Sequence, residues 1–411
     1  MGVDAPLFYE EPINLVRGEG VWLYSVDGRR YLDIYNNVPC VGHSNGRVVE
    51  AMAAQASTLN VHSRYLNERV IDYVERLVDL HHEGLTSAVI TCTGSEANEV
   101  AIMMARTATG KTGIIGTDAT YHGNTSEVAK LTRLPVGEYR PGVKSIPAPQ
   151  LFRPLQADIS EDSLCDLYID HLRQRIDEFN KEGDGFAGIL MCSILANEGL
   201  MTAPAGFFAR ACEVVHSAGG LVIADEVQAG FARSGSWWGY EVNNFQPDIV
   251  SLGKPMGNGM PLAGVVASHE LVSQFRAKHR YFNTFAANPV QAAVGNAVID
   301  EIETRGLVAQ VASTGAYLVD ELKTLQPHHG AMGDVRGTGL FIGIDWVHPG
   351  TTDPDPSGAT KMVEELKQRG VLMGQAGQYR NVLKIRPPLV FDQTHADIFL
   401  SAFAGALNND G

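Results

Sequence analysis

The stretch AGFFARACEVVHSAGGLVIADEVQAG, residues 205–230, decides the fold. Its first half is typical of a helix, and a pair of glycines marks the end of that helix. The segment LVIADEV that follows is typical of a buried strand. The strand ends in two carboxylates, Asp225 and Glu226. Because carboxylates are rarely left at the edge of a core without a partner, this pair indicates that a cation or a proton lies nearby.

Strands and helices alternate through the rest of the middle of the chain. SAVITCT is strand-like, and the apolar residues of GSEANEVAIMMARTAT, three or four positions apart, predict a helix over 94–109. Further strands are predicted from KTGIIGT, GFAGILMCS, PDIVSLGK and PLAGVVAS. The alternation predicts a mainly parallel sheet covered on both faces, in which ligands gather at the carboxyl ends of the strands. Residues 93–95, Asp225 and Lys254 all fall at such ends.

Two flanking regions differ from this middle part. From about residue 306 the chain reads as a helix, GDVRGTGLFIGIDWV, a Pro/Gly/Asp loop, another helix and the strand NVLKIRPPL, which is typical of a smaller α+β domain. The N-terminal GVWLYSVDGRRYLD predicts a hairpin with an Asp-Gly turn. We therefore expect residues 1–50 to contribute to the small domain, 51–305 to form the large domain and 306–411 to form the C-terminal small domain.

Composition argues against several classes of function. The net charge of −15 disfavours a nucleic-acid partner, because phosphate-backbone binding needs a basic face. The cysteines are odd in number and irregularly spaced, which predicts free thiols in a reducing compartment. The histidines show no zinc pattern, and the pairs at 81–82 and 328–329 are expected on the solvated surface. No long apolar run or signal peptide is found, so we expect a cytoplasmic protein without a membrane partner.

Four positions at the strand ends carry chemistry, and each also has a purely structural interpretation. Ser95 at a helix start favours a bound phosphate, or is simply an N-cap. Tyr121 stacks on a planar ligand, or packs at the start of its loop. Asp225 holds a protonated ring nitrogen, or pairs with Arg233. Lys254 bonds to a carbonyl cofactor, or is a surface cation.

Taken jointly, these residues carry a resemblance to a known family. The chain resembles the pyridoxal-phosphate enzymes of fold type I, specifically the class III aminotransferase family, along nearly its whole length. The matching segments are, in order, LFYEEPINLVRGEGVWLYSVDGRRYLD, GHSNGRVVEAM, TGSEANE, YHG, ADEVQAGFARSG, PDIVSLGKPMGNGMPLAGVV, FNTFAANP, GTGLFIGID and LKIRPPL. The resemblance implies an α/β fold whose large domain holds a mainly parallel seven-stranded sheet, with a small α+β domain beside it.

The resemblance also implies the cofactor, pyridoxal 5'-phosphate, and its contacts. Lys254 would bond covalently to it, and Asp225, with the ring nitrogen rather than a side chain as its partner, would keep that nitrogen protonated. Gln228 would lie near the ring hydroxyl, while Glu226 is expected to be structural and to point away. Thr284 would reach the cofactor phosphate from a neighbouring subunit, so the active site is expected at the interface of a homodimer or tetramer. The expected cofactor contacts are Gly94, Ser95, Tyr121, His122, Asp225, Val227, Gln228, Lys254 and Thr284.

Local motifs favour the phospho-lyase branch of this family. The segments that resemble those lyases are NNVPCVGH, HSRYL, GKPMGNG, YFNTF and NVLKIRPP. Where many class III aminotransferases carry an arginine for a substrate carboxylate, this chain has Lys384. A lysine suits a phosphate but lacks the bidentate fork that an arginine offers to a carboxylate. The candidates for substrate binding are Asn37, His62, Ser63, Arg64, Lys384 and Arg386.

A second departure from the family lies in CSILANEG, residues 192–199. Cys192, Leu195 and Asn197 stand where many members have Glu, Gln and a later Glu. In some aminotransferases that later Glu pairs with the carboxylate-binding arginine and helps the site alternate between two substrates. The departure favours a one-substrate lyase, with Glu198 as a partial substitute and Cys192 as a small core residue.

We therefore expect an enzyme that eliminates phosphate from O-phosphoethanolamine, a small phosphorylated amine, to give acetaldehyde, ammonia and phosphate. Lys254 would remove the proton from the carbon that bears the nitrogen, and general base catalysis of this kind contributes about 10²–10⁴-fold. The alternative is a class III ω-amine or amino-acid aminotransferase, which shares the first half of this path. A third hypothesis, a non-catalytic cofactor-binding protein, is disfavoured by the intact set of cofactor residues.

Overall fold

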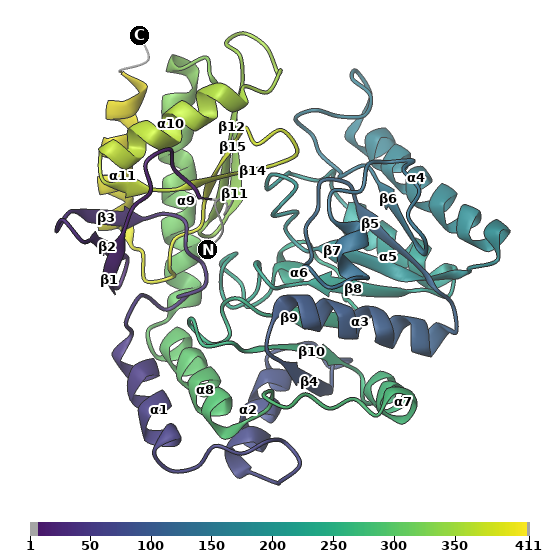
Figure 1. Cartoon of the computed structure of the whole chain (residues 1–411). Coiled ribbons are helices and arrows are strands. Elements are labelled where there is room, and N and C mark those ends of the chain that lie inside the picture. Colours follow the sequence, from purple (N-terminus) through teal and green to yellow (C-terminus); the bar gives the residue numbers. More distant parts are fainter. Residues whose placement is uncertain (1–6, 409–411) are drawn as a thin grey trace.

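The middle part of the sequence forms a seven-stranded sheet (Figure 1). The computed structural model describes residues 7–408. The strand order is β4-β10-β9-β8-β7-β5-β6, with bounds β4 Ser87–Thr91, β5 Gly113–Thr117, β6 Val143–Ile146, β7 Phe186–Cys192, β8 Leu221–Asp225, β9 Ile249–Leu252 and β10 Ala263–Ala267. β10 is antiparallel to β4 and β9, and the other neighbours pair in parallel. The predicted α/β fold with a mainly parallel seven-stranded sheet is therefore confirmed.

Helices cover both faces of this sheet, which explains why its strands are apolar along their length. Successive residues of β8 point to opposite faces. Ile223 packs in the layer of α3 (Gly94–Thr109) and α7 (His269–His279). Its neighbours Val222 and Ala224 pack in the layer of α4 (Glu161–Glu182) and α5 (Phe207–Ser217). The sheet therefore separates two apolar layers. Because both of its faces are covered, a binding site can form only at the polar ends of the strands.

The two ends of the chain build two further sheets. The first has the order β1-β2-β3-β13, with bounds Leu15–Glu19, Trp22–Ser25, Arg30–Asp33 and Val371–Leu372. The second has the order β11-β12-β15-β14, with bounds Met332–Thr338, Phe341–Trp346, Val382–Ile385 and Gly374–Ala376. β2 and β3 are antiparallel and Gly28 has φ 83°, so the predicted hairpin with an Asp-Gly turn is confirmed. β13 pairs with β3, which joins the N-terminal segment to the C-terminal region, and the domain boundaries at 50 and 305 stay predictions.

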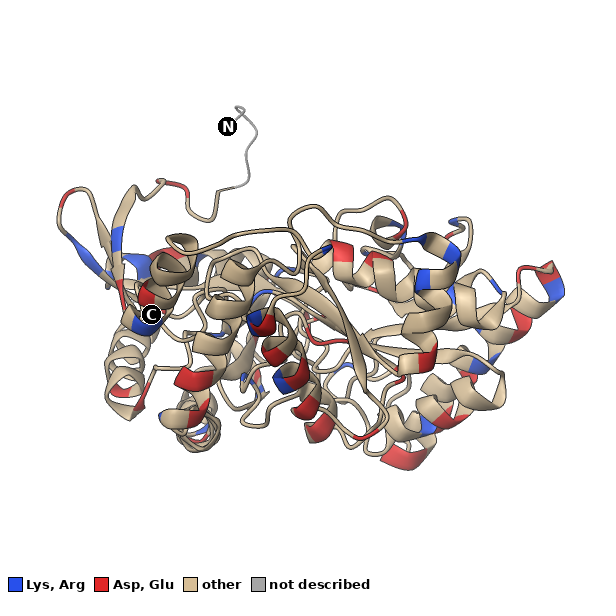
Figure 2. Ribbon diagram, turned by 90° about the horizontal axis from the view of Figure 1, so that it is seen from below, with Lys and Arg blue, Asp and Glu red and all other residues tan. Residues whose placement is uncertain are grey.

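The remaining helices surround these sheets. Their bounds are α1 Gly46–Ala56, α2 Glu68–Asp79, α6 Gly239–Val242, α8 Pro289–Thr304, α9 Leu307–Leu325, α10 Pro356–Gln368 and α11 Gln393–Leu407, with short 3-10 turns η1 at Val128–Leu131 and η2 at Gln326–His328. Acidic and basic residues alternate along the outer helices (Figure 2). Among residues 7–408 no helix is both long and apolar enough to cross a membrane, and the cytoplasmic location stays a prediction.

Two sequence predictions about single residue types have different outcomes. The cysteines are free, and all but Cys92 are buried, so the prediction of unpaired thiols is confirmed. The prediction of a solvated histidine pair at 81–82 is wrong. The His81 ring stacks on Trp238 with ring centroids 4.0 Å apart, and His82 Nε2 lies 3.0 Å from the Pro247 carbonyl oxygen. Burial lowers the pKa of His81 to about 3, because the apolar faces of an imidazole pack well against an indole while its charged form is excluded from such a place.

Candidate active site

Three segments that are distant in sequence meet at the carboxyl ends of β8 and β9. Because β8 and β9 are parallel and Asp225 pairs with Ser251, Lys254 follows three residues beyond the partner of Asp225. A Cβ added at Gly94 would stand 2.7 Å from Val227 Cγ1, and one at Gly253 would stand 3.0 Å from the same methyl group. The start of α3, the residues after Asp225 and the residues before Lys254 therefore touch one another, and glycine is required where they meet.

Asp225 is held by side chains on one oxygen and by the backbone on the other. Its Oδ2 accepts a hydrogen bond from Asn98 Nδ2 at 3.0 Å and lies 2.6 Å from His122 Nδ1, and its Oδ1 accepts from the Val227 amide at 3.0 Å. The expectation that no side chain partners Asp225 is therefore wrong. The alternative, an ion pair between Asp225 and Arg233, is also wrong, because the Arg233 guanidinium donates to the carbonyls of Leu340 and Pro387.

A buried polar network extends behind Asp225. His122 Nε2 lies 2.9 Å from Thr120 Oγ1, so both ring nitrogens of His122 have protein partners. Asn98 Nδ2 also donates to the His122 carbonyl at 2.7 Å, and its Oδ1 accepts from Ser251 Oγ at 2.5 Å. All these side chains are buried. The sequence prediction named His122 as a cofactor contact, and the structure gives its imidazole the task of orienting Asp225.

Glu226, beside Asp225, has a structural role as expected. Its two carboxylate oxygens accept hydrogen bonds from the amides of Gly239 and Tyr240, at 2.9 and 2.8 Å, where α6 begins. The side chain is fully buried and points away from the Asp225 network. It is therefore not part of an acid/base pair.

The start of α3 is open to an anion. Thr93, not Ser95, caps this helix: Thr93 Oγ1 accepts from the Glu96 amide at 3.2 Å, and Glu96 Oε2 accepts from the Thr93 amide at 3.1 Å. The interpretation of Ser95 as the N-cap is therefore wrong. Ser95 Oγ instead accepts from the Asn124 amide at 3.1 Å, which brings the loop after Tyr121 next to the helix start. Free amides and the helix dipole make this end suited to a phosphate.

Lys254 is a half-buried amine, and its Nζ has no hydrogen-bond partner among residues 7–408. Burial lowers the pKa of Lys254, and this effect is opposed by the nearby Asp225 carboxylate and reinforced by the Arg386 cation. A lowered pKa leaves more of the amine neutral, which is the form that attacks a carbonyl carbon or takes up a proton. The interpretation of Lys254 as a surface cation does not fit this position.

Two buried cations face neutral groups on the other side of the site. Lys384 Nζ donates to the Ala196 carbonyl at 2.7 Å and to Gln228 Oε1 at 3.3 Å, and Arg386 Nη1 donates to the same Gln228 oxygen at 2.5 Å. Neither cation forms an ion pair with a carboxylate in the part of the chain that the structure describes. Arg386 Nε and Asn37 Nδ2 are buried polar atoms without a partner among residues 7–408. The two cations therefore have no carboxylate within ion-pair distance, although Glu198 and Asp33 act on them from farther away, and this arrangement fits an anionic ligand.

The family-like segment 192–199 forms no ion pair with these cations within residues 7–408. Asn197 accepts from Gln228 Nε2 at 3.0 Å and donates to the Tyr121 carbonyl at 2.9 Å. Glu198, considered as a partial substitute for the missing Glu, accepts instead from Thr117 Oγ1 at 2.7 Å. Glu198 also acts on Lys384 through its charge without an ion pair, so its role as a partial substitute stays a prediction. Cys192 is a buried core residue, as its sequence context predicted.

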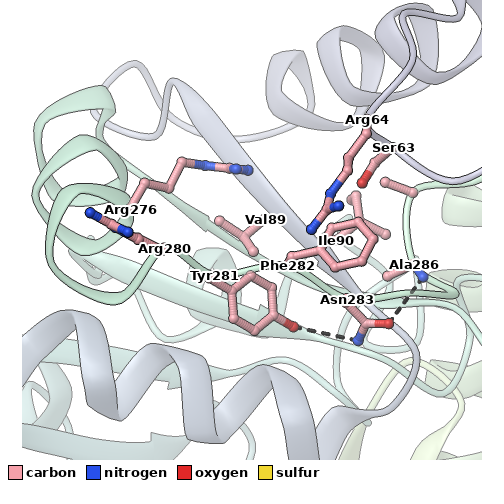
Figure 3. A pocket seen from close by; sticks show the side chains of 11 residues that line it. Ser63, Arg64, Val89, Ile90, Arg276, Arg280, Tyr281, Phe282, Asn283 and Ala286 are labelled. Carbon is pink, nitrogen blue, oxygen red and sulfur yellow. Dashed lines mark hydrogen bonds between the residues drawn. The ribbon is translucent and has the colours of Figure 1, made fainter.

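The remaining predicted residues lie elsewhere in the chain. His62, Ser63 and Arg64 gather around Phe282, with the Arg64 guanidinium 4.0 Å from the centre of that ring. Ser63, Arg64 and Phe282 line a pocket of about 460 Å³ (Figure 3), and none of the residues Lys254, Lys384 and Arg386 lines it. Thr284 follows Phe282 closely and is exposed. In a single chain the predicted substrate group is thus divided, with Lys384 and Arg386 around Gln228 and with His62 and Arg64 around Phe282.

Comparison with known proteins agrees with this geometry. A family model described as aminotransferase class-III matches residues 8–407. A Drosophila melanogaster protein named alanine–glyoxylate aminotransferase 2-like is 36% identical over 99% of this chain and 85% of its own length. A Caenorhabditis elegans protein named ethanolamine-phosphate phospho-lyase homolog 1 is 31% identical over 96% of this chain and 88% of its own. A solved phospholyase from Arthrobacter, in complex with phosphoethanolamine, is 41% identical, with a TM-score of 0.95 over 99% of this chain and 97% of its own.

The match to this family implies pyridoxal phosphate as the cofactor, and the residues of this chain fit it. The start of α3 offers amides for the phosphate, Asp225 offers a buried carboxylate for the ring nitrogen, and Lys254 offers an unpaired amine for the aldehyde carbon. Val227 and Tyr121 remain the predicted contacts with the two faces of the ring.

Asn98→Ala is expected to weaken cofactor binding by about tenfold, because Asp225 loses a buried donor that orients it toward the ring nitrogen and a hydrogen bond to a charged group is worth about 1.5–3 kcal/mol. The measurement is a fluorescence titration of the cofactor-free protein with pyridoxal phosphate. Asn180→Ala, at an exposed position of α4, is the matched control. An unchanged dissociation constant in the Asn98 variant would show that the network does not position Asp225.

Proposed function

The chain belongs to the class III aminotransferase family, and we propose that within it the protein is a pyridoxal-phosphate-dependent phospho-lyase acting on O-phosphoethanolamine. The observation that carries this proposal is the buried pair Lys384 and Arg386, whose partners are neutral oxygens. Two cations without a carboxylate partner match a phosphate dianion better than a single carboxylate. The 41% identical neighbour described with phosphoethanolamine supports the same choice.

The residues of the site divide the work of elimination among them. When bound, pyridoxal phosphate joins the substrate amine and delocalises the electron pair released at the carbon that bears it. Lys254 Nζ takes the proton from that carbon, for which a neutral amine is needed. Asp225, held by Asn98 and His122, keeps a proton on the ring nitrogen.

The buried cations act on the leaving group. In this proposal Lys384 Nζ, Arg386 Nε and Asn37 Nδ2 hold the phosphate oxygens as the carbon–oxygen bond breaks, which is supported by the neutral partner of Lys384 and by the unpartnered Arg386 Nε and Asn37 Nδ2. The two-carbon product is then hydrolysed, so that O-phosphoethanolamine and one water give acetaldehyde, ammonia and inorganic phosphate. We also propose a homodimer or tetramer in which the exposed Thr284 reaches the cofactor phosphate of a neighbouring subunit.

The experiment that tests this proposal measures both products. Purified holoprotein is incubated with O-phosphoethanolamine, and inorganic phosphate and acetaldehyde are assayed together. We expect equal amounts of the two. Phosphate release no higher than that of a Lys254→Ala control would overturn the proposal.

An aminotransferase is the second candidate, and the relative named alanine–glyoxylate aminotransferase 2-like supports it. An aminotransferase would convert the cofactor to its amine form with an amino donor alone and restore it with a keto acid. Absorbance spectra recorded after each addition distinguish the two activities, because a lyase returns the cofactor to its starting form in every turnover.

A further inference from the structure

A single side chain in the loop after β7 connects Gln228 with the loop at Tyr121. Asn197 Oδ1 accepts a hydrogen bond from Gln228 Nε2 at 3.0 Å, and Asn197 Nδ2 donates to the Tyr121 carbonyl at 2.9 Å. We propose that Asn197 is a positioning residue that determines substrate specificity. It fixes the side chain of Gln228 and, because it is uncharged, leaves Lys384 and Arg386 to a doubly charged substrate group. This rests on the proposed function, which names that group as a phosphate.

Hydrogen-bond donors fix the direction in which the Gln228 amide faces. Lysine and arginine side chains can only donate, so the amide oxygen must face Lys384 Nζ and Arg386 Nη1, at 3.3 and 2.5 Å. The amide nitrogen is thereby turned to the other side, where it donates to Asn197. Asn197 therefore supplies the acceptor that completes this orientation, although it contacts neither cation through these bonds.

The side chain of Asn197 is oriented by the same logic. A backbone carbonyl only accepts, so Asn197 Nδ2 must face Tyr121 and Asn197 Oδ1 must face Gln228. Asparagine is common in turns because its side chain bonds to its own loop, but both of these bonds go to other segments of the chain. The loop is also strained, since Leu195 and Leu200 have φ 47° and 57°. Turn formation alone therefore does not explain an asparagine at this position.

The neutrality of Asn197 matters as much as its orientation. An aspartate here would have the same shape and could accept from Gln228 Nε2, but it could not donate to the Tyr121 carbonyl. It would also place a negative charge against the amide that both cations contact, and these cations have no ion-pair partner among residues 7–408. A phosphate dianion would then meet a like charge, whereas an uncharged amine would not. The asparagine therefore favours a substrate with a strongly anionic group.

The test compares two substitutions for which charge and packing predict opposite orders of damage. Asn197→Asp keeps the size of the side chain and adds a charge, whereas Asn197→Ala removes both hydrogen bonds and adds no charge. Asn180→Asp, at an exposed position of α4, is the matched control for the added charge. Calorimetry of the holoprotein with inorganic phosphate measures the binding that Lys384→Met removes. We expect Asn197→Asp to weaken this binding at least about tenfold, Asn197→Ala to weaken it less, and Asn180→Asp to match the parent.

The measurements separate this proposal from the proposed function. If O-phosphoethanolamine releases no phosphate, the proposed function fails, but the order of phosphate binding still tests Asn197. If phosphate is released, the KM should rise in the same order as the binding weakens. A parent that binds no phosphate overturns the proposal, and so does a loss in Asn197→Ala that equals or exceeds the loss in Asn197→Asp, because the side chain would then act by packing and hydrogen bonding alone.

A titration of the cofactor-free variants with pyridoxal phosphate tests the other partner of Asn197. We expect Asn197→Asp to lose less affinity for the cofactor than for inorganic phosphate. An equal or larger loss for the cofactor overturns the proposal, because Asn197 would then act through the loop at Tyr121 and not through the two cations.

Discussion

Lys254→Ala is expected to abolish phosphate release from O-phosphoethanolamine, and this is the largest effect that a single substitution at the site should produce. The amine has two tasks, attachment of the cofactor and removal of the substrate proton, and loss of the base alone reduces the rate by about 10²–10⁴-fold. The measurement is the steady-state rate of phosphate release, together with the absorbance of the purified protein near the cofactor's visible band.

The controls for this prediction separate chemistry from folding. Lys254→Arg keeps a cation near Asp225 but offers no free amine, so it should be about as inactive as the alanine variant. Both variants should unfold at urea concentrations close to that of the parent, because the Lys254 amine makes no hydrogen bond among residues 7–408. A Lys254→Ala protein that retains the parent rate would place the reaction at another lysine.

The fold was largely predictable because its signals are local. The helix over 94–109 was predicted from apolar spacing, and the structure has α3 at Gly94–Thr109, although the residue that caps it is Thr93 and not Ser95. The buried strands were visible as short apolar runs between glycines. The pairing of β3 with β13 was not predictable in this way, because it joins residues more than 300 positions apart.

The site was predictable residue by residue but not as a network. Asp225 and Lys254 were found because both follow buried strands. Asn98 was missed, although it lies one turn after Gly94 on the same face of α3, because its partners Asp225 and Ser251 become neighbours only once the strand order is known. In the same way, the sequence predicted a cation at Lys384 but not its burial among neutral oxygens.

Lys384→Met is expected to act on binding and on stability in opposite directions. The KM for O-phosphoethanolamine should rise by about 30-fold or more, since loss of one partner of a buried, hydrogen-bonded charge pair costs about 2–5 kcal/mol. The free energy of unfolding should rise by about 1 kcal/mol, because burying an unpaired charge costs several kcal/mol that an apolar side chain avoids. Loss of the hydrogen bond offsets part of that gain, by about 1–3 kcal/mol, because the buried Ala196 carbonyl is left without a donor. Kinetics with the substrate and urea unfolding of the free protein measure the two effects separately.

The gain in stability should also depend on pH in a defined sense. Burial, reinforced by the nearby Arg386 cation, holds the pKa of Lys384 well below its usual range. At a pH below that lowered pKa, the lysine is charged in both the folded and the unfolded chain, and the folded chain bears the whole penalty of burying the charge. As the pH rises through the lowered pKa toward the ordinary value, the folded chain becomes neutral first, so the parent gains stability and its deficit against Lys384→Met shrinks. Lys384→Arg keeps a cation at this position, so it should retain the low KM. Because an arginine stays protonated throughout this pH range, the difference in unfolding free energy between Lys384→Arg and Lys384→Met should not shrink as the pH rises. A Lys384→Met protein that is less stable than the parent and binds O-phosphoethanolamine equally well would show that this lysine is a structural hydrogen-bond donor and not a receptor for phosphate.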